Sequence, residues 1–162
     1  MTIKEFYEKY GDVELTEEQE KHIKECLNIK EKWKPEEDEN FYFVNSCGDI
    51  FINTFHNTCD DKFRILTNNY FKTEEEAKFK LEQIKVYNEL KNFADENNEE
   101  IDLLKYENLY RIEYLVYNKR LDVSNYVMLD IGQIYFSSEK LAQQAIEKVG
   151  ADRIKKYLFG VE

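Results

Sequence analysis

The residues that could bind a transition metal are two histidines and three cysteines, and four of these five form two close pairs. His22 and Cys26 are four residues apart, which places them on one face of a helix. His56 and Cys59 are three apart, in a stretch that we expect to be a loop. A zinc site with two cysteines and two histidines would require the pairs to meet. We favour separate residues, because the pairs are far apart in the sequence and Cys26 fits the apolar side of its helix.

Nucleophilic catalysis would need Cys47 or Cys59 beside His56, and no third residue evidently orients that histidine. The sequence contains no G-x-S-x-G, H-E-x-x-H, P-loop or dinucleotide-binding fingerprint. An odd number of cysteines without framework spacing favours free thiols in a reducing cytoplasm. We therefore expect a non-catalytic protein with no cofactor and no bound metal.

Carboxylates are the most abundant reactive groups, and they give the chain a net charge of −11. Residues 1–40 contain 13 acids and 7 bases, residues 41–100 contain 12 and 7, and the remainder contains 9 of each. Such an acidic region disfavours direct nucleic-acid binding, which needs Lys and Arg against phosphate. It would instead attract a basic surface on another protein, such as a nucleic-acid groove.

The acids that we expect to bind a partner fall into three groups along the chain. They are the run Glu36, Glu37, Asp38 and Glu39, the pair Asp60 and Asp61, and the triplet Glu74, Glu75 and Glu76. Acidic runs are usually solvated surface. The first two groups could also offer oxygen ligands to a cation, but the alternating pattern of an EF-hand is absent.

The longest predicted helix begins at Thr73, whose hydroxyl can cap the first turn while Glu76 completes a capping box. It continues to the Asn97-Asn98 break. One apolar face recurs every three or four residues. This face comprises Ala77, Leu81, Ile84, Tyr87, Leu90 and Ala94.

A second apolar seam follows the same helix with a spacing of seven residues: Phe79, Val86 and Phe93. Two interpretations remain open. The seam can pack beneath the N-terminal helices, or it can form a dimer face, because an uncovered apolar stripe promotes association.

The elements around this helix predict an α+β fold of two similar ββ(β)α units, residues 31–100 and 101–162, after an N-terminal helical segment, residues 1–30. Strands at 41–44 and 50–55 flank a turn with Gly48, and strands at 110–117 and 121–123 flank a second turn. We expect a loop over 56–62 and a β-like piece at 63–66.

The two helix entries superpose at an offset of 65 residues, with Phe71 on Phe136, Thr73 on Ser138 and Ala77 on Ala142. Because each unit alone is too small for stability, we expect the two to share one core, with helices layered on one antiparallel sheet. The apolar runs are too short for a membrane span, and the charged N-terminus does not resemble a signal peptide.

Several of these motifs occur together in the order W33-K-P-E-E-D-E-N-F-Y-F-V, N69-Y-F-K-T-E-E-E-A, I134-Y-F-S-S-E-K-L-A and K155-K-Y-L-F-G-V-E. This order resembles a group of small proteins encoded by phages and prophages of low-GC Gram-positive bacteria, over about residues 31–162. The chain departs from the group at Asn69, where glycine is expected.

Most members of this group have no assigned function. The resemblance implies a phage context, in which small acidic proteins often inhibit host enzymes, including CRISPR and restriction nucleases. We therefore expect a protein of the host cytoplasm that inhibits a nucleic-acid-binding defence protein through its acidic surface. The alternative is a phage accessory or scaffold protein that self-associates through the Phe79, Val86 and Phe93 seam.

Overall fold

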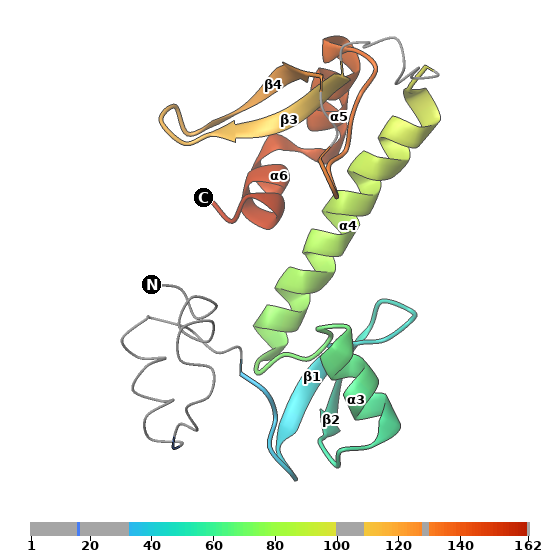
Figure 1. Cartoon of the computed structure of the whole chain (residues 1–162), viewed down its shortest axis with the longest axis vertical. Helices are drawn as coiled ribbons and strands as arrows, with labels where there is room; N and C mark the ends of the chain where they lie inside the picture. Colours follow the sequence, from blue (N-terminus) through green and yellow to red (C-terminus); the bar gives the residue numbers. More distant parts are fainter. Residues whose placement is uncertain (1–15, 17–32, 100–108, 128–129, 162) are drawn as a thin grey trace. The chain divides into compact units, whose positions relative to one another are not determined.

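The computed structural model of this chain describes residues 16, 33–99, 109–127 and 130–161 (Figure 1). The chain divides into two units, Met1–Lys34 and Pro35–Glu162, and every helix and strand reported below belongs to the second unit. Apart from Thr16, the predicted N-terminal helical segment falls outside the described residues. The predicted boundary near residue 100 also lies outside them, because residues 100–108 are not described.

The described part of the chain is α+β, as the sequence predicts, with four helices and two small antiparallel sheets of two strands each. The predicted single sheet is wrong for these residues, because the two hairpins do not pair with each other. The two hairpins are separated in the chain by two helices, and each pairs only with itself.

The first hairpin joins β1 (Asn40–Val44) to β2 (Ile50–Thr54) with Tyr42 opposite Ile52. Gly48 adopts a φ of 82° in the turn, as expected for a residue without a side chain. The Oδ1 atom of Asn45 accepts hydrogen bonds from the backbone N–H groups of Cys47 and Asp49, which closes the turn.

The outer edge of β1 is extended by the segment that leads into the long helix. Tyr42 and Phe71 exchange two backbone hydrogen bonds of 2.9 Å in an antiparallel bridge. The side-chain amide of Asn69 accepts from the N–H of Val44 and donates to its carbonyl. Asn68, rather than Asn69, takes the positive φ of 56°. Asn69 therefore acts as a side-chain extension of the sheet at the position where the resemblance leads one to expect glycine.

Helix α3 (Cys59–Leu66) corrects the sequence prediction of a loop over 56–62 and a β-like piece at 63–66. Its N-cap is Thr58, whose hydroxyl accepts from the N–H of Asp61, while the Asp61 carboxylate accepts from the N–H of Thr58. This is a capping box with aspartate in place of the usual glutamate or glutamine. Because aspartate takes the place of glutamate or glutamine in the cap and the apolar run is short, the sequence pattern did not indicate a helix here.

Helix α4 (Glu74–Asn97) confirms the predicted N-cap at Thr73, the capping box with Glu76 and the end near Asn98. It contacts β1 and β2 as well as α5 (Glu139–Val149) and α6 (Ala151–Leu158). At its C-terminal end, the side chain of Asn98 donates to the carbonyl of Tyr135 and accepts from the N–H of Ser137. These bonds fasten the helix to the segment that precedes α5.

The second hairpin joins β3 (Leu109–Leu115) to β4 (Arg120–Tyr126), with Ile112 opposite Val123. Tyr110 exchanges two backbone hydrogen bonds with Phe136, of 2.9 and 2.8 Å. The hydroxyl of Ser138 then caps α5 by accepting from the N–H of Leu141.

The main core cluster joins one stripe of α4 to α5, α6 and Phe136. The buried residues of this cluster are Val86, Leu90, Phe93, Ala94, Phe136, Ala142, Ala145, Val149 and Ile154. Their positions on α4 follow the i, i+4, i+7, i+8 pattern of an amphipathic helix. Ile84 and Tyr87, which the sequence analysis assigned to the buried face, are 41% and 37% exposed. The buried stripe of α4 is therefore rotated about the helix axis, away from the predicted face and toward Val86 and Phe93.

Replacing Phe136 with alanine should destabilise the fold by about 3–5 kcal/mol, because the ring is fully buried and its removal leaves a cavity. Val116→Ala is the matched control, since that side chain is 78% exposed in the β3–β4 turn and should cost less than about 0.5 kcal/mol. Urea denaturation measures the free energy of unfolding of both variants. Equal midpoints for the two variants would contradict the position of this core.

Candidate functional site

The acidic run lies in a turn directly before β1, and its backbone is held by hydrogen bonds on both sides. The N–H of Asp38 donates to the carbonyl of Phe55, and the N–H of Phe55 donates to the carbonyl of Glu39, each over 2.9 Å. Asp38 has a φ of 63°. Glu36, Glu37 and Asp38 are exposed, whereas Glu39 is half-buried and accepts a bond from the N–H of Glu36. Three carboxylates of the run therefore face solvent.

His56 lies against this run from the end of β2. Its Nδ1 atom is 3.2 Å from a carboxylate oxygen of Asp38 and 4.0 Å from one of Glu37. All three side chains are exposed. Residues far apart in the sequence thus converge on one small surface region that sequence reasoning had treated as two separate sites.

Asp60 and Asp61, which the sequence analysis grouped together, have different roles. Asp60 is exposed in the first turn of α3, and no hydrogen bond or ion pair holds its carboxylate in the described part of the chain. Asp61 is only 1% exposed and cannot contribute to an acidic surface. Its inclusion among the partner-binding residues is therefore wrong.

The Asp61 carboxylate is instead an internal hydrogen-bond acceptor. It accepts hydrogen bonds from the Thr58 hydroxyl at 2.8 Å, from the N–H groups of His56 and Thr58 at 3.1 Å, and from the Arg64 guanidinium at 3.3 Å. Burial by itself raises the pKa of Asp61, but the bonds from Thr58 and His56 and the charge of Arg64 outweigh it and lower the pKa below its ordinary value. The ionised form is thus the one that the fold stabilises.

The three glutamates at the start of α4 are all exposed but differ in their contacts. Glu74 forms an ion pair with Lys78 at 2.7 Å, and its hydrogen bond raises the pKa of that lysine. Glu76 accepts from the N–H groups of Lys72 and Thr73 as part of the cap. Glu75 has no hydrogen bond or ion pair within the described residues. Only Glu75 is therefore fully available to a partner.

The proposed dimer seam is wrong for two of its three residues. Val86 is fully buried and Phe93 is 8% exposed, both in the core cluster, where the Phe93 ring lies 6.5 Å from that of Phe136. Phe79 remains partly exposed, and its ring lies 5.1 Å from the Tyr157 ring of α6. The seam is an internal packing surface for most of its length.

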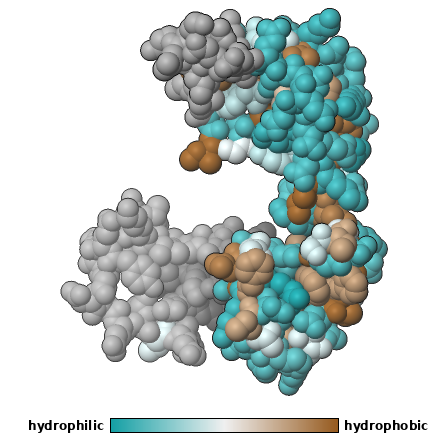
Figure 2. Space-filling view, turned by 90° about the vertical axis from the view of Figure 1, so that its right-hand side faces the viewer, coloured by the Kyte–Doolittle hydropathy of each residue, from teal (hydrophilic) through white to brown (hydrophobic). Residues whose placement is uncertain are grey.

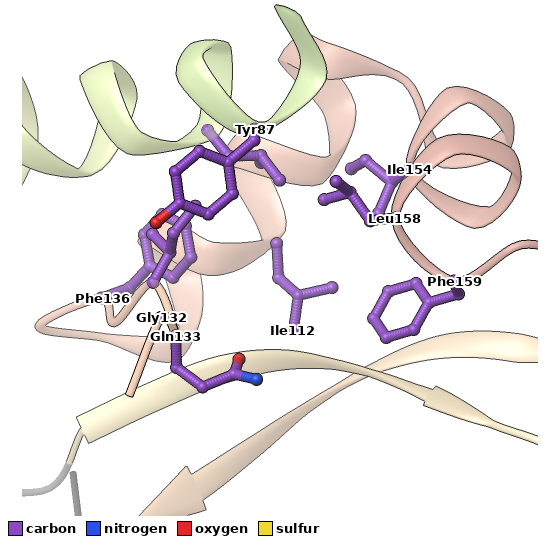
Figure 3. A pocket seen from close by; sticks show the side chains of 10 residues that line it. Tyr87, Ile112, Gly132, Gln133, Phe136, Ile154, Leu158 and Phe159 are labelled. Carbon is purple, nitrogen blue, oxygen red and sulfur yellow. The ribbon is translucent and has the colours of Figure 1, made fainter. Parts of the chain in front are cut away.

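One pocket of about 220 Å³ opens between α4, β3 and α6. Figure 3 shows Tyr87, Ile112 and Leu158 turned toward this shared space, with Gln133 at one side. The lining contains no carboxylate, lysine, arginine or histidine, and the Tyr87 phenol is its one side chain of a type used in general acid–base catalysis. The full set is Tyr87, Leu90, Ile112, Gly132, Gln133, Ile134, Phe136, Ile154, Leu158 and Phe159.

A wider groove of about 760 Å³ lies between the first hairpin, α3 and α4, with Phe43, Phe63 and Ile84 among its lining residues. Arg64 also lines it and holds its guanidinium carbon 4.0 Å above the Phe43 ring. On the face shown in Figure 2, hydrophobic residues gather over the part of the chain that carries β1, β2 and α3. Exposed Phe51, Ile52 and Leu66 belong to these elements.

The zinc arrangement of two cysteines and two histidines is not assembled by the described residues. Cys47 and Cys59 are exposed free thiols, whereas His22 and Cys26 lie outside the described part of the chain. His56 directs its Nδ1 atom to carboxylates rather than to sulfur.

Comparison with known proteins gives no family model, curated protein or solved structure that matches this chain. Among the helices of the described residues, none has the length and apolar character needed to cross a membrane.

Replacing Asp61 with asparagine should destabilise the fold by about 2–3 kcal/mol at neutral pH, because the donors of Thr58, His56 and Arg64 would lose a buried, charged acceptor. Since the folded-state pKa of Asp61 is lowered, its contribution is present above the unfolded pKa of about 3.9 and is lost as pH falls through the folded value. Unfolding midpoints measured across pH should therefore converge for wild type and variant in acid.

Asp60→Asn is the matched control, one position away and exposed, and it should leave the midpoint nearly unchanged. An Asp61→Asn deficit that persists undiminished at the lowest pH would contradict the assigned role of this carboxylate.

Proposed function

We propose that this chain is a non-catalytic, phage-encoded binding protein whose acidic surface occupies the nucleic-acid groove of a host defence protein and thereby inhibits it. The observation that carries the proposal is the exposure of carboxylates in the turn before β1 and in the first turns of α3 and α4. Within the described part of the chain, five of the nine acids singled out in the sequence are exposed and not held by an ion pair to a lysine or arginine or by a helix cap. They are Glu36, Glu37, Asp38, Asp60 and Glu75.

The chemistry of these groups indicates what kind of partner they would bind. Exposed carboxylates interact with Lys and Arg, the same residues that bind phosphate in a nucleic-acid groove. Complementary charge accelerates encounter and disfavours other acidic partners. A partner whose natural ligand is a polyanion is thus the best match for this surface.

The resemblance to phage and prophage proteins supplies the setting, a host cytoplasm in which a small acidic inhibitor would meet such a nuclease. We also propose that the described elements are two ββ(β)α units of related design. Each hairpin is followed by a bridging residue, Phe71 or Phe136, and by a helix capped by Thr73 or Ser138. A fully buried alanine occupies the same position in both helices.

Self-association through the seam on α4 is not proposed as an alternative, because Val86 and Phe93 are already covered within the chain. Catalysis is not proposed either. The pocket of Figure 3 has no carboxylate, lysine, arginine or histidine in its lining, and the carboxylate with a lowered pKa, Asp61, is buried in a structural network.

Capture of partners from the lysate of a low-GC Gram-positive bacterium should yield a basic nucleic-acid-binding protein, identified by mass spectrometry. Binding of that protein should weaken about tenfold or more when Glu36, Glu37 and Asp38 are changed to Gln, Gln and Asn, because each change removes an exposed charge. It should also weaken steeply as salt is raised, since exposed charges are screened.

The matched control changes three exposed acids elsewhere, Glu139, Glu147 and Asp152, to Gln, Gln and Asn. This variant has the same net charge as the first, and it should bind like wild type. Equal weakening by both variants would show that overall charge alone governs binding. Equal affinity of wild type and both variants for the partner would contradict the proposed binding surface.

A further inference from the structure

We infer that Glu37, Asp38 and His56 form a binding site for a divalent transition-metal ion of the zinc class. One ligand atom from each residue lies within 4.8 Å of the other two. The residues come from two segments, the turn before β1 and the end of β2, so the convergence is produced by the fold. Nitrogen from histidine and oxygen from carboxylates are both ordinary zinc ligands.

The separations between the ligand atoms are close to those around a tetrahedral metal ion. Ligands placed about 2.1 Å from a tetrahedral ion are about 3.4 Å apart. The Nδ1 atom of His56 lies 3.2 Å from Asp38 and 4.0 Å from Glu37, so small side-chain movements would bring all three to that spacing. The side chains are exposed and free to make this adjustment.

Charge also favours a divalent ion at this position. Two carboxylates converge here, and a protonated imidazole could compensate only one of them. A divalent cation compensates both and accepts the Nδ1 lone pair of a neutral ring. Three protein ligands leave a coordination position for water or for a group from another molecule.

The backbone beneath the three ligands is fixed before any ion binds. Asp38 and Phe55 are joined by a 2.9 Å hydrogen bond that connects the two segments directly. The N–H of His56 donates to the buried carboxylate of Asp61, which anchors the histidine to the start of α3. A ligand set held by a rigid frame loses less conformational entropy on binding.

The test is Zn²⁺ binding to the full chain under reducing conditions, measured by competition with a chromophoric chelator. His56→Gln and Asp38→Asn should each lower the affinity about tenfold or more. His22→Gln removes the other histidine of the chain, and Asp60→Asn removes a nearby exposed acid, so both should bind like wild type. Thermal unfolding of each variant without metal separates loss of a ligand from loss of the fold.

Exposed Cys47 and Cys59 are alternative zinc ligands, and Co²⁺ distinguishes them. Cobalt bound by Glu37, Asp38 and His56 should lack the thiolate charge-transfer absorption that cysteine ligation produces. Zinc affinity unchanged in His56→Gln, or a thiolate band that disappears when Cys47 and Cys59 are replaced by serine, would overturn the inference. The outcome is independent of whether a protein partner is found.

Discussion

The structure depends on the burial of one face of α4, because this helix contacts both the first hairpin and the two C-terminal helices. Ala77, Val86, Leu90, Phe93 and Ala94 are its buried residues. Alanines at 77, 142 and 145 are fully buried, and such small side chains let packed elements approach closely. The remaining surface of α4 carries charged residues together with the exposed Phe79, Ile84 and Tyr87.

The packing has a direct electrostatic consequence. Asp61 is drawn into the fold as the acceptor that holds Thr58, His56 and Arg64, and its charge is used internally. Neighbouring Asp60 and the run before β1 remain exposed. The network around Asp61 also fixes the backbone of His56, so a buried acid positions one ligand of the proposed metal site.

The sequence was informative wherever a local rule operates without help from distant residues. The cap at Thr73, the turn at Gly48 and the end of α4 near Asn98 all follow from neighbouring side chains, and each was predicted. Helix α3 was missed because its capping partner is Asp61, and because the run from Phe63 to Leu66 has the composition of a strand. Periodicity alone could not distinguish two overlapping apolar stripes on α4, since the choice depends on where α5 and α6 pack.

Only part of the candidate site could be predicted from the sequence, because the rest depends on contacts between distant segments of the chain. The acids could be counted, and their exposure at Glu36, Glu37 and Asp38 agrees with the expectation of a solvated run. The approach of His56 to that run could not be found, because it requires the register of β1 against β2. The pairing of Tyr42 with Phe71 is likewise a product of tertiary structure.

The central claim is that the acidic surface takes the place of nucleic acid on its partner. Its most direct test adds increasing amounts of this chain to the captured partner bound to fluorescently labelled nucleic acid, with anisotropy as the readout. The account predicts that the label is released at the concentrations at which the two proteins bind. A stable ternary complex, in which partner, nucleic acid and this chain remain together, would contradict it.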